Sequence, residues 1–449
     1  RPACCPERRK AAPAGPSAPS ARPQSTSTFC FPKKYSETAI MSLGYAEKLS
    51  YRSDLGGQLG SPELFDGDAE LSAKVGELAE LMRASRRIMV FTGAGISTSC
   101  GIPDFRGPGG IWTLQRAGQP LPKPKVSFTF ARPSLTHMAL VALHESGKLA
   151  YVCSQNVDGL HLRSGIPRRA LAELHGNCFA ERCHKCGAEY IRDFEIETVG
   201  FKRTGRSCST EGCAGRLRDH ILDWEDALPP DELEASEAHA SEADLTICLG
   251  TSLQITPACN LPLRTVKGGG KLVIVNLQKT PKDKSAHLLI RGRADEVMRG
   301  ALQRLGMPVP PFVRRDRLIL LFHQPPPRNS KHEAAPFSVS VCSAQGQRLP
   351  LPVLTSVAIS FPDHPAVKGS TLRKAPFTMT RSGPLPGVLR VQFDLQFAEG
   401  LGEEAPRSMQ AQAEFKLLGA TELKALGTAA TGTAAPSGSA GCPFSTSHL

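Results

Sequence analysis

The fold is decided by one short segment, "IMVFTGAGIST" at residues 88–98. Its first residues, Ile88 to Phe91, are apolar without interruption, which is typical of a strand buried on both faces. Gly93 and Gly95 follow, and glycines at a strand end let the backbone approach a pyrophosphate. The segment predicts a strand, a phosphate-binding turn and then a helix, whose N-terminus would supply N–H donors and a positive dipole end.

Similar patterns recur on both sides of this segment. Apolar residues at three- and four-residue steps predict a helix over 69–85, with Asp68 as its N-cap. Further buried strands are predicted at 151–154, 245–249 and 272–275, with helical stretches between them. Because apolar strands that alternate with helices form parallel sheets, we predict an α/β protein with a Rossmann-like sheet covered on both faces.

The composition excludes some classes of protein. The chain has 449 residues, of which 40% are hydrophobic, and it contains no run of eighteen apolar residues, so we expect no membrane association. Its formal net charge of +12 favours acidic partners such as DNA or chromatin. The same charge is equally compatible with a basic protein that binds no nucleic acid.

The cysteines suggest a metal and not a disulfide framework. Among fourteen cysteines, four form two close pairs at metal-ligand spacing: Cys183, Cys186, Cys208 and Cys213. Four thiolates bind zinc tetrahedrally and leave no position open for water, so the predicted zinc is structural. The nearby Cys178 and His184 are not expected to be ligands. Since the pairs interrupt the strand–helix alternation, we predict a small zinc module inserted at about 176–225.

The two ends of the chain have a different character. Residues 1–40 are rich in Pro, Ala, Ser and Arg, which predicts a disordered leader, although an organelle transit peptide has a similar composition. Beyond about residue 308, alternation of apolar and polar residues, clearest at 389–397, predicts a β-rich, sandwich-like module over 308–420. Residues 421–449 are mostly Ala, Gly, Ser and Thr and predict a disordered tail.

Five segments, in order, resemble the signatures of the sirtuin family. They are "TGAGISTSCGIPDFRGPGGIWT" (92–113), "SQNVDGLH" (154–161), "LAELHGN" (171–177), "LGTSLQI" (249–255) and "VIVNLQ" (273–278). The resemblance covers roughly residues 41–307, which we take as the catalytic domain. The "WED" segment at 224–226 and the opening "MSLGYAEKL" at 41–49 are similar to the class IV branch, which includes nuclear chromatin enzymes, and the β-rich extension looks like that of plant members.

This resemblance implies an activity and a set of site residues. It implies an NAD⁺-dependent protein-lysine deacetylase or deacylase that transfers the acyl group to ADP-ribose and releases nicotinamide. Acylated proteins such as histone tails would be substrates, and the nucleus the location. His175 is implied as the base, and an imidazole suits that step because its ordinary pKa lies near working pH. The implied cofactor-binding residues are Gly93, Ala94, Gly95, Thr98, Phe105, Arg106, Trp112, Gln155, Asn156, Asp158, Gly250, Ser252, Asn276, Gln278 and Ala294.

Several of these residue types have a physical reason to be there. Arg106 can meet phosphate oxygens with a forked set of donors. Phe105 and Trp112 could shield the reacting ribose from water, or could simply pack in the core. Asp104 could serve as the N-cap of the next helix and is left out of the catalytic set.

Three other functions compete with the deacylase. A mono-ADP-ribosyltransferase would use the same residues, so the sequence does not separate the two. A chromatin-binding scaffold with little turnover is favoured slightly by the positive charge and the β-rich module. A hydride-transferring dehydrogenase is disfavoured, because Ser97 or Thr98 stands where the third glycine of the dinucleotide fingerprint would be.

Overall fold

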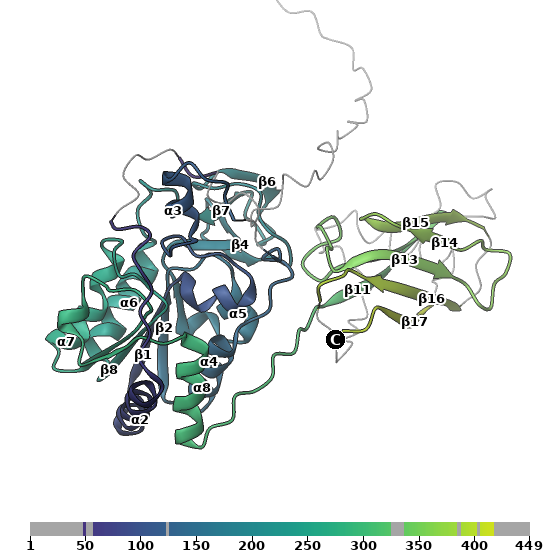
Figure 1. The fold of residues 1–449 in the computed structure, drawn as a ribbon. Coiled ribbons are helices and arrows are strands. Elements are labelled where there is room, and N and C mark those ends of the chain that lie inside the picture. The colour runs from purple at the N-terminus through teal and green to yellow at the C-terminus, as the bar shows by residue number, and fades with distance from the viewer. Residues whose placement is uncertain are drawn as a thin grey trace, which may run out of the picture. The chain divides into compact units, whose positions relative to one another are not determined.

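The computed structural model describes residues 48–50, 57–122, 125–324, 336–383, 388–401 and 405–416 (Figure 1). The predicted leader at 1–40 and the predicted tail at 421–449 lie outside these residues. Within the described part of the chain, no helix combines the length and the apolar character needed to cross a bilayer.

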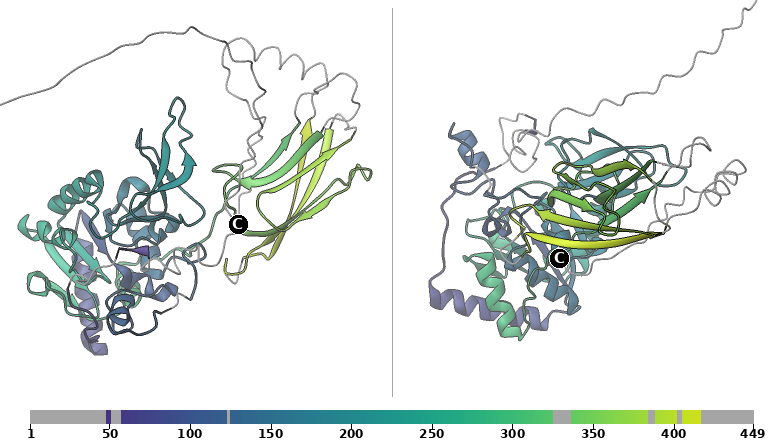
Figure 2. Two further views of the ribbon diagram at one scale, coloured as in Figure 1. Left: turned by 90° about the horizontal axis from the view of Figure 1, so that it is seen from above. Right: turned by 90° about the vertical axis from the view of Figure 1, so that its right-hand side faces the viewer.

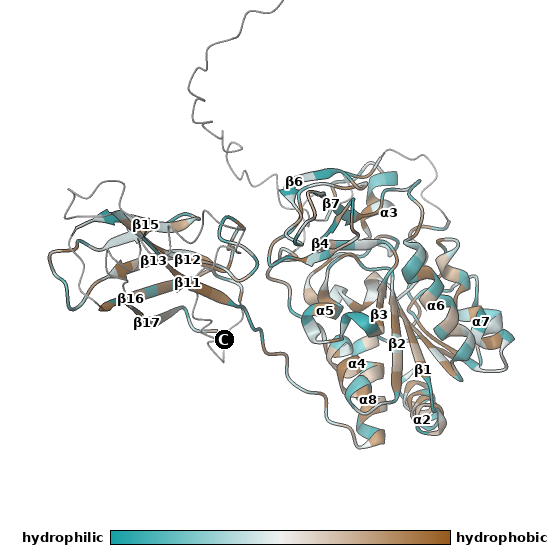
Figure 3. Ribbon diagram, turned by 180° about the vertical axis from the view of Figure 1, so that it is seen from behind, coloured by the Kyte–Doolittle hydropathy of each residue, from teal (hydrophilic) through white to brown (hydrophobic). Residues whose placement is uncertain are grey.

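The parallel sheet that the sequence predicted is present and has six strands. In spatial order its strands are β10 (Leu288–Ile290), β9 (Lys271–Val275), β8 (Leu245–Leu249), β1 (Ile88–Thr92), β2 (Leu149–Ser154) and β3 (Leu171–Glu173). Every neighbouring pair is parallel. All five residues of β1 are buried, and the strands of this sheet are largely brown in Figure 3, which marks hydrophobic residues. Such strands require cover on both faces.

Helices supply that cover. On one face pack α2 (Asp68–Ala84), α4 (Leu135–Glu145) and α8 (Ala294–Leu305). On the other lie α6 (Pro230–Glu242) and α7 (Pro262–Lys267). Side chains of β1 alternate between the two layers: Ile88 and Val90 join the first core, whereas Met89 and Phe91 join the second. The alternation follows from the two-residue period of a strand.

Two local predictions were wrong. The N-cap of α2 is Gly67, and Asp68 is already the first helical residue, without a capping bond. No α-helix follows Gly95 either; the chain makes two short 3-10 turns, Ala94–Ile96 and Thr98–Cys100. Gly101, at φ 84°, ends the second turn, and a helix is disfavoured directly before Pro103. The expected helix dipole is therefore missing from this turn.

A second, antiparallel sheet follows β3 almost at once. Its order is β5 (Glu189–Ile191), β4 (Gly176–Cys183), β7 (Arg216–Ile221) and β6 (Arg203–Ser207). Only Leu174 and His175 separate β3 from β4, so the chain passes directly from one sheet into the other at His175.

The C-terminal strands form the predicted sandwich. One sheet holds β11 (Leu318–His323), β12 (Pro336–Ser343) and β15 (Phe377–Ser382); the other holds β14 (Ser370–Leu372), β13 (Leu354–Ser360), β16 (Val388–Phe397) and β17 (Ser408–Lys416). Phe337 and Val339 of the first sheet share one core with Val357 and Phe393 of the second, and Figure 2 shows the strands from two further sides. Two sheets that bury a common core make a sandwich.

Candidate functional site

A pocket opens at the carboxyl ends of the central parallel strands, where α/β sheets bind their ligands. The turns after β1, β2, β3, β8 and β9 each contribute to it, together with the loop 104–112. Its lining residues are Gly93, Ala94, Gly95, Asp104, Phe105, Arg106, Gly107, Trp112, Gln155, Asn156, Val157, His175, Gly250, Thr251, Ser252, Ile255, Asn276 and Gln278.

The floor of the pocket is made by two backbone turns in close contact. A Cβ added to Gly95 would lie 2.7 Å from Cα of Gly250, and one added to Gly93 would lie 2.8 Å from the carbonyl oxygen of Gly250. The N–H groups of Gly93 and Gly95 already donate to Leu249 and Gly250. These glycines therefore shape a floor that a flat ligand can approach, and they do not serve as its hydrogen-bond donors.

His175 enters this pocket from the link between the two sheets. Its Nδ1 lies 3.1 Å from the backbone oxygen of Gln155. Because a carbonyl oxygen can only accept, Nδ1 carries the hydrogen and Nε2 keeps a lone pair. Burial lowers the pKa of His175 to about 4. The ring is thus a neutral base at physiological pH, with its basic nitrogen away from the Gln155 carbonyl.

Aromatic rings and one guanidinium form a wall of the pocket. The ring centroids of Phe105 and Trp112 are 4.6 Å apart, and those of Trp112 and Trp224 are 4.8 Å apart. The guanidinium carbon of Arg106 lies 4.4 Å from the Trp112 centroid, a cation–π distance. Burial lowers the pKa of Arg106 to about 10, so the group stays charged at neutral pH. This wall combines a fixed cation with apolar surface that keeps water out.

The four paired cysteines converge on one point. Their sulfur atoms all lie within 4.8 Å of one another, with Cys183 and Cys213 at 3.7 Å and Cys186 and Cys208 at 3.6 Å. A disulfide would need about 2.05 Å, whereas a tetrahedral zinc with bonds of about 2.3 Å separates its sulfurs by about 3.8 Å. The donor set and its spacing fit one zinc ion with no open position.

The two spare donors near the cluster are engaged elsewhere. Cys178 is fully buried among apolar side chains. Nδ1 of His184 lies 3.0 Å from the backbone nitrogen of Arg216. Neither residue joins the four-sulfur group.

Comparison with known proteins identifies the family of this chain. A model of the Sir2 family matches residues 122–257. A protein of Arabidopsis thaliana named NAD-dependent protein deacetylase SRT1 is 53% identical over 360 residues, which cover 80% of this chain and 76% of that protein. The chain belongs to the Sir2 family, as its five sirtuin-like segments predicted.

Other members of the Sir2 family are similar over a smaller share of the chain. A Drosophila melanogaster protein named NAD-dependent protein deacetylase Sirt6 is 49% identical over 279 residues, covering 61% of this chain and 87% of the relative. A solved structure described as Sir2 with a p53 peptide and NAD⁺ is 34% identical, has a TM-score of 0.40, and covers 51% of this chain and 98% of its own.

Most of the residues that the Sir2 signatures implied come together, but three do not line the pocket. Thr98 is exposed, and its hydroxyl donates to the Gly95 oxygen at 3.1 Å. Asp158 lies beneath the floor, where its Oδ2 accepts from the Ser97 hydroxyl at 2.7 Å. Ala294 is the first residue of α8 and packs on the core of the sheet. The Asp158 carboxylate thus supports the turn that carries Ser97.

The pocket also contains residues that were not singled out from the sequence, namely Asp104, Gly107, Val157, Thr251 and Ile255. Thr251 stands between two residues that were, and its hydroxyl accepts from Nε2 of Gln155 at 2.8 Å. Asp104 does not cap the next helix as suggested: the N-cap of α3 (Ile111–Arg116) is Gly110, and Asp104 instead accepts from the Gly107 nitrogen at 3.1 Å. Burial raises the pKa of Asp104.

Proposed function

We propose that this chain is an NAD⁺-dependent protein-lysine deacetylase whose base is His175. The observation that carries the proposal is the neutral imidazole, with a lone pair on Nε2, at the edge of a pocket floored by the Gly93–Gly95 and Gly250 turns. The printed names of the relatives, NAD-dependent protein deacetylases, support the same reaction.

The residues of the pocket have distinct tasks in this reaction. Bound NAD⁺ would supply the electrophilic ribose carbon that accepts the acyl oxygen and releases nicotinamide. His175, whose Nε2 keeps its lone pair, would accept the proton of a hydroxyl held at the edge of the pocket. Gln155, held by Thr251, and Asn156, whose amide donates to the Gly93 oxygen at 3.1 Å, would orient the ribose. Arg106 would meet phosphate, and Asn276 and Gln278 the adenosine end.

The aromatic wall would protect the reacting centre. Phe105 and Trp112 exclude water, which would otherwise compete with the acyl oxygen for the ribose carbon. Because Trp112 is only 8% exposed while it lines the pocket, core packing and shielding are compatible roles for the same ring.

The zinc at Cys183, Cys186, Cys208 and Cys213 would be structural, since four protein ligands complete its coordination. We further propose that the chain acts on histones in the nucleus and contacts DNA. This proposal is supported by the net charge of +12 and by the similarity to Sirt6 and sirtuin-7 proteins.

One experiment tests the reaction. Acetyl-lysine peptides are incubated with NAD⁺ and the purified chain, and product masses are read directly. We expect a peptide that has lost its acetyl group, free nicotinamide and an acetylated ADP-ribose in equal amounts. A peptide that gains the mass of ADP-ribose would favour the transferase, and no release of nicotinamide by a folded, zinc-loaded chain would favour a scaffold.

A further inference from the structure

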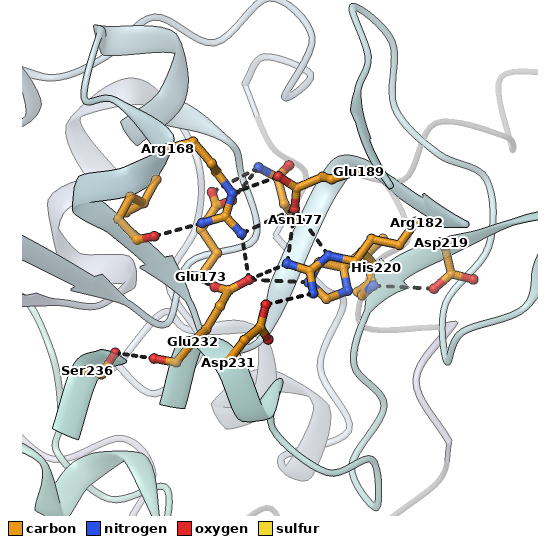
Figure 4. A network of polar contacts seen from close by, with 12 residues as sticks. Arg168, Glu173, Asn177, Arg182, Glu189, Asp219, His220, Asp231, Glu232 and Ser236 are labelled. Atoms are coloured by element: carbon orange, nitrogen blue, oxygen red, sulfur yellow. Dashed lines mark hydrogen bonds and ion pairs between the residues drawn. The ribbon is translucent and has the colours of Figure 1, made fainter. Parts of the chain in front are cut away.

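A partly buried polar network joins the two sheets (Figure 4), and two of its members, Glu173 and Asn177, lie two residues before and two residues after His175. At its centre lies Glu232 of α6, whose side chain is 5% exposed. Burial of a carboxylate is costly unless hydrogen bonds and opposite charges compensate it. The partners that compensate the charge of Glu232 come from both sheets, so the network links the two sheets to each other.

The two oxygens of Glu232 contact the chain on both sides of His175. Oε2 accepts from the backbone nitrogen of Glu173, the last residue of β3. Oε1 accepts from Nη2 of Arg182 on β4, at 2.8 Å. One carboxylate therefore binds the strand that ends two residues before His175 and the strand that begins directly after it.

Two arginines and a second carboxylate close the network. Arg168, just before β3, donates Nη2 to Glu232 at 2.6 Å and Nε to Glu189 at 2.8 Å. Arg182 donates Nε to Glu189 at 3.2 Å. Two guanidiniums and two carboxylates thus alternate, with no net charge. Although burial alone raises the pKa of Glu232, the imidazole of His220, whose Nε2 lies 3.5 Å from Oε1, and the charge of Arg168 lower this pKa to about 2.

The same groups do not form a second metal site. Oxygens of Glu189 and Glu232 and a nitrogen of His220 lie within 4.8 Å of one another, a spacing that metal ligands could share. Both carboxylates, however, already face the guanidiniums of Arg168 and Arg182. A metal cation would have to displace these charges or be repelled by them.

The network also reaches the turn that carries His175. Nδ2 of Asn177 lies 2.9 Å from each oxygen of the Glu173 carboxylate, which links the residues two before and two after the histidine. The backbone oxygen of His175 accepts from the Leu222 nitrogen at 3.1 Å. By contrast, the β1 and β8 turns that floor the pocket, and the β9 turn that also lines it, make no hydrogen bond or ion pair with Glu232 in the described residues.

We infer that Glu232 is a positioning residue for His175, which holds β3 and β4 at a fixed separation so that the imidazole between them keeps its place over the pocket. This inference rests on the proposed deacetylase function. Since the floor does not depend on Glu232, loss of its charge should slow the step that needs the base and leave NAD⁺ binding and nicotinamide release nearly intact. Displacement of a reacting group by about 1 Å can cost about a hundredfold in rate.

The test compares Glu232→Gln with Asp231→Asn, a neighbouring carboxylate that is 65% exposed and touches Arg182 only at 3.5 Å. For each variant, acetyl transfer is measured together with the return of labelled nicotinamide into NAD⁺, a reaction that does not need the base. We expect Glu232→Gln to lower kcat for acetyl transfer about ten- to hundredfold. Its KM for NAD⁺ and its rate of nicotinamide return should stay within about twofold of the parent, as should all rates of Asp231→Asn.

A proportional fall in both reactions would mean that Glu232 serves only general stability, and unchanged rates would mean that it has no role; either result overturns the inference. If Glu232→Gln does not fold, Arg182→Lys replaces it, because lysine keeps the charge but cannot bridge two carboxylates with a planar fork. The same split between the two reactions is then required. Absence of nicotinamide release from the parent chain would instead contradict the proposed function.

Discussion

Nδ1 of His175 donates to the backbone oxygen of Gln155 across 3.1 Å. This bond links the junction between β3 and β4 to the loop after β2. It selects the tautomer in which Nε2 keeps the lone pair that the proposed base needs. A substitution that removes the ring therefore removes the proton acceptor without disturbing the glycine floor.

His175→Ala should lower the rate of acetyl transfer by about 10²–10⁴-fold, the usual contribution of a positioned general base. Binding of NAD⁺, measured by calorimetry, should change little. Equal activity of the variant and the parent would contradict the assignment of the base.

Removal of the metal should unfold the small sheet. We expect one zinc per chain by elemental analysis, and Cys186→Ala should lose it and melt at a lower temperature, because binding energy of a structural zinc is folding energy. Cys342→Ala in the C-terminal sandwich is the control and should keep the metal. A zinc-free Cys186→Ala protein with the parent's melting temperature would exclude a structural zinc.

Binding of NAD⁺ should change the tryptophan fluorescence. The chain has two tryptophans, Trp112 and Trp224, whose rings lie 4.8 Å apart, and Trp112 lines the pocket. Titration with NAD⁺ should give a saturable change with a midpoint near the KM. Trp224→Phe should keep this response and Trp112→Phe should lose most of it; the reverse pattern would place the ligand elsewhere.

Gly250→Ala should lower the free energy of unfolding by more than the cost of placing an alanine in a left-handed backbone conformation. Gly250 has φ 58°, and an added Cβ would lie 2.7 Å from the backbone of Gly95. Gly118 is the matched control, since it has φ 64° and nothing within 4 Å of an added Cβ. Gly118→Ala should cost about 1–2 kcal/mol in urea unfolding, and Gly250→Ala clearly more, with loss of NAD⁺ binding. Equal costs would mean that the two turns can separate freely.

Stability should fall between pH 7 and pH 5. Burial lowers the pKa of His137 to about 4 and that of His161 to about 3. Between these values and the ordinary pKa near 6.5, the unfolded chain binds protons that the folded chain excludes, so stability is lost as the pH falls. The Glu232 carboxylate, with a pKa of about 2, stays charged in this range. Glu173, whose pKa burial raises to about 8, binds a proton in the folded chain and offsets part of the loss from the two histidines. Melting temperatures at pH 7 and pH 5 test the sign, and a higher value at pH 5 would contradict it.

The sequence predicted what depends on local pattern. Apolar runs at 88–91 and at 245–249, the second broken only by Thr246, predicted buried parallel strands. The alternation at 389–397 predicted a half-buried strand, because burial of one face or of both faces determines the pattern of apolar residues along a strand. The spacing of Cys183 and Cys186 likewise predicted that their sulfurs would meet those of the second pair.

What the sequence did not predict depends on contacts distant along the chain. The 3-10 turn that contains Gly95 packs against Gly250, and no local sequence pattern predicts that contact. The tilted contact between the Trp112 and Trp224 rings and the hydrogen bond from the Glu173 nitrogen to Glu232 also join residues that are distant along the chain. Glu232 in particular reads as an ordinary first-turn residue of an exposed helix, and only the packing of α6 buries it.

The direct passage from β3 to β4 through Leu174 and His175 has a final consequence. Because this junction has only two residues, it cannot absorb a movement between the parallel sheet and the antiparallel sheet. Any such movement therefore displaces the imidazole of His175. An inhibitor of this protein therefore need not compete with NAD⁺ at all. If His175 is the base and Glu232 positions it as proposed, a compound that separates Glu232 of α6 from Arg182 of β4 should slow acetyl transfer by displacing the imidazole.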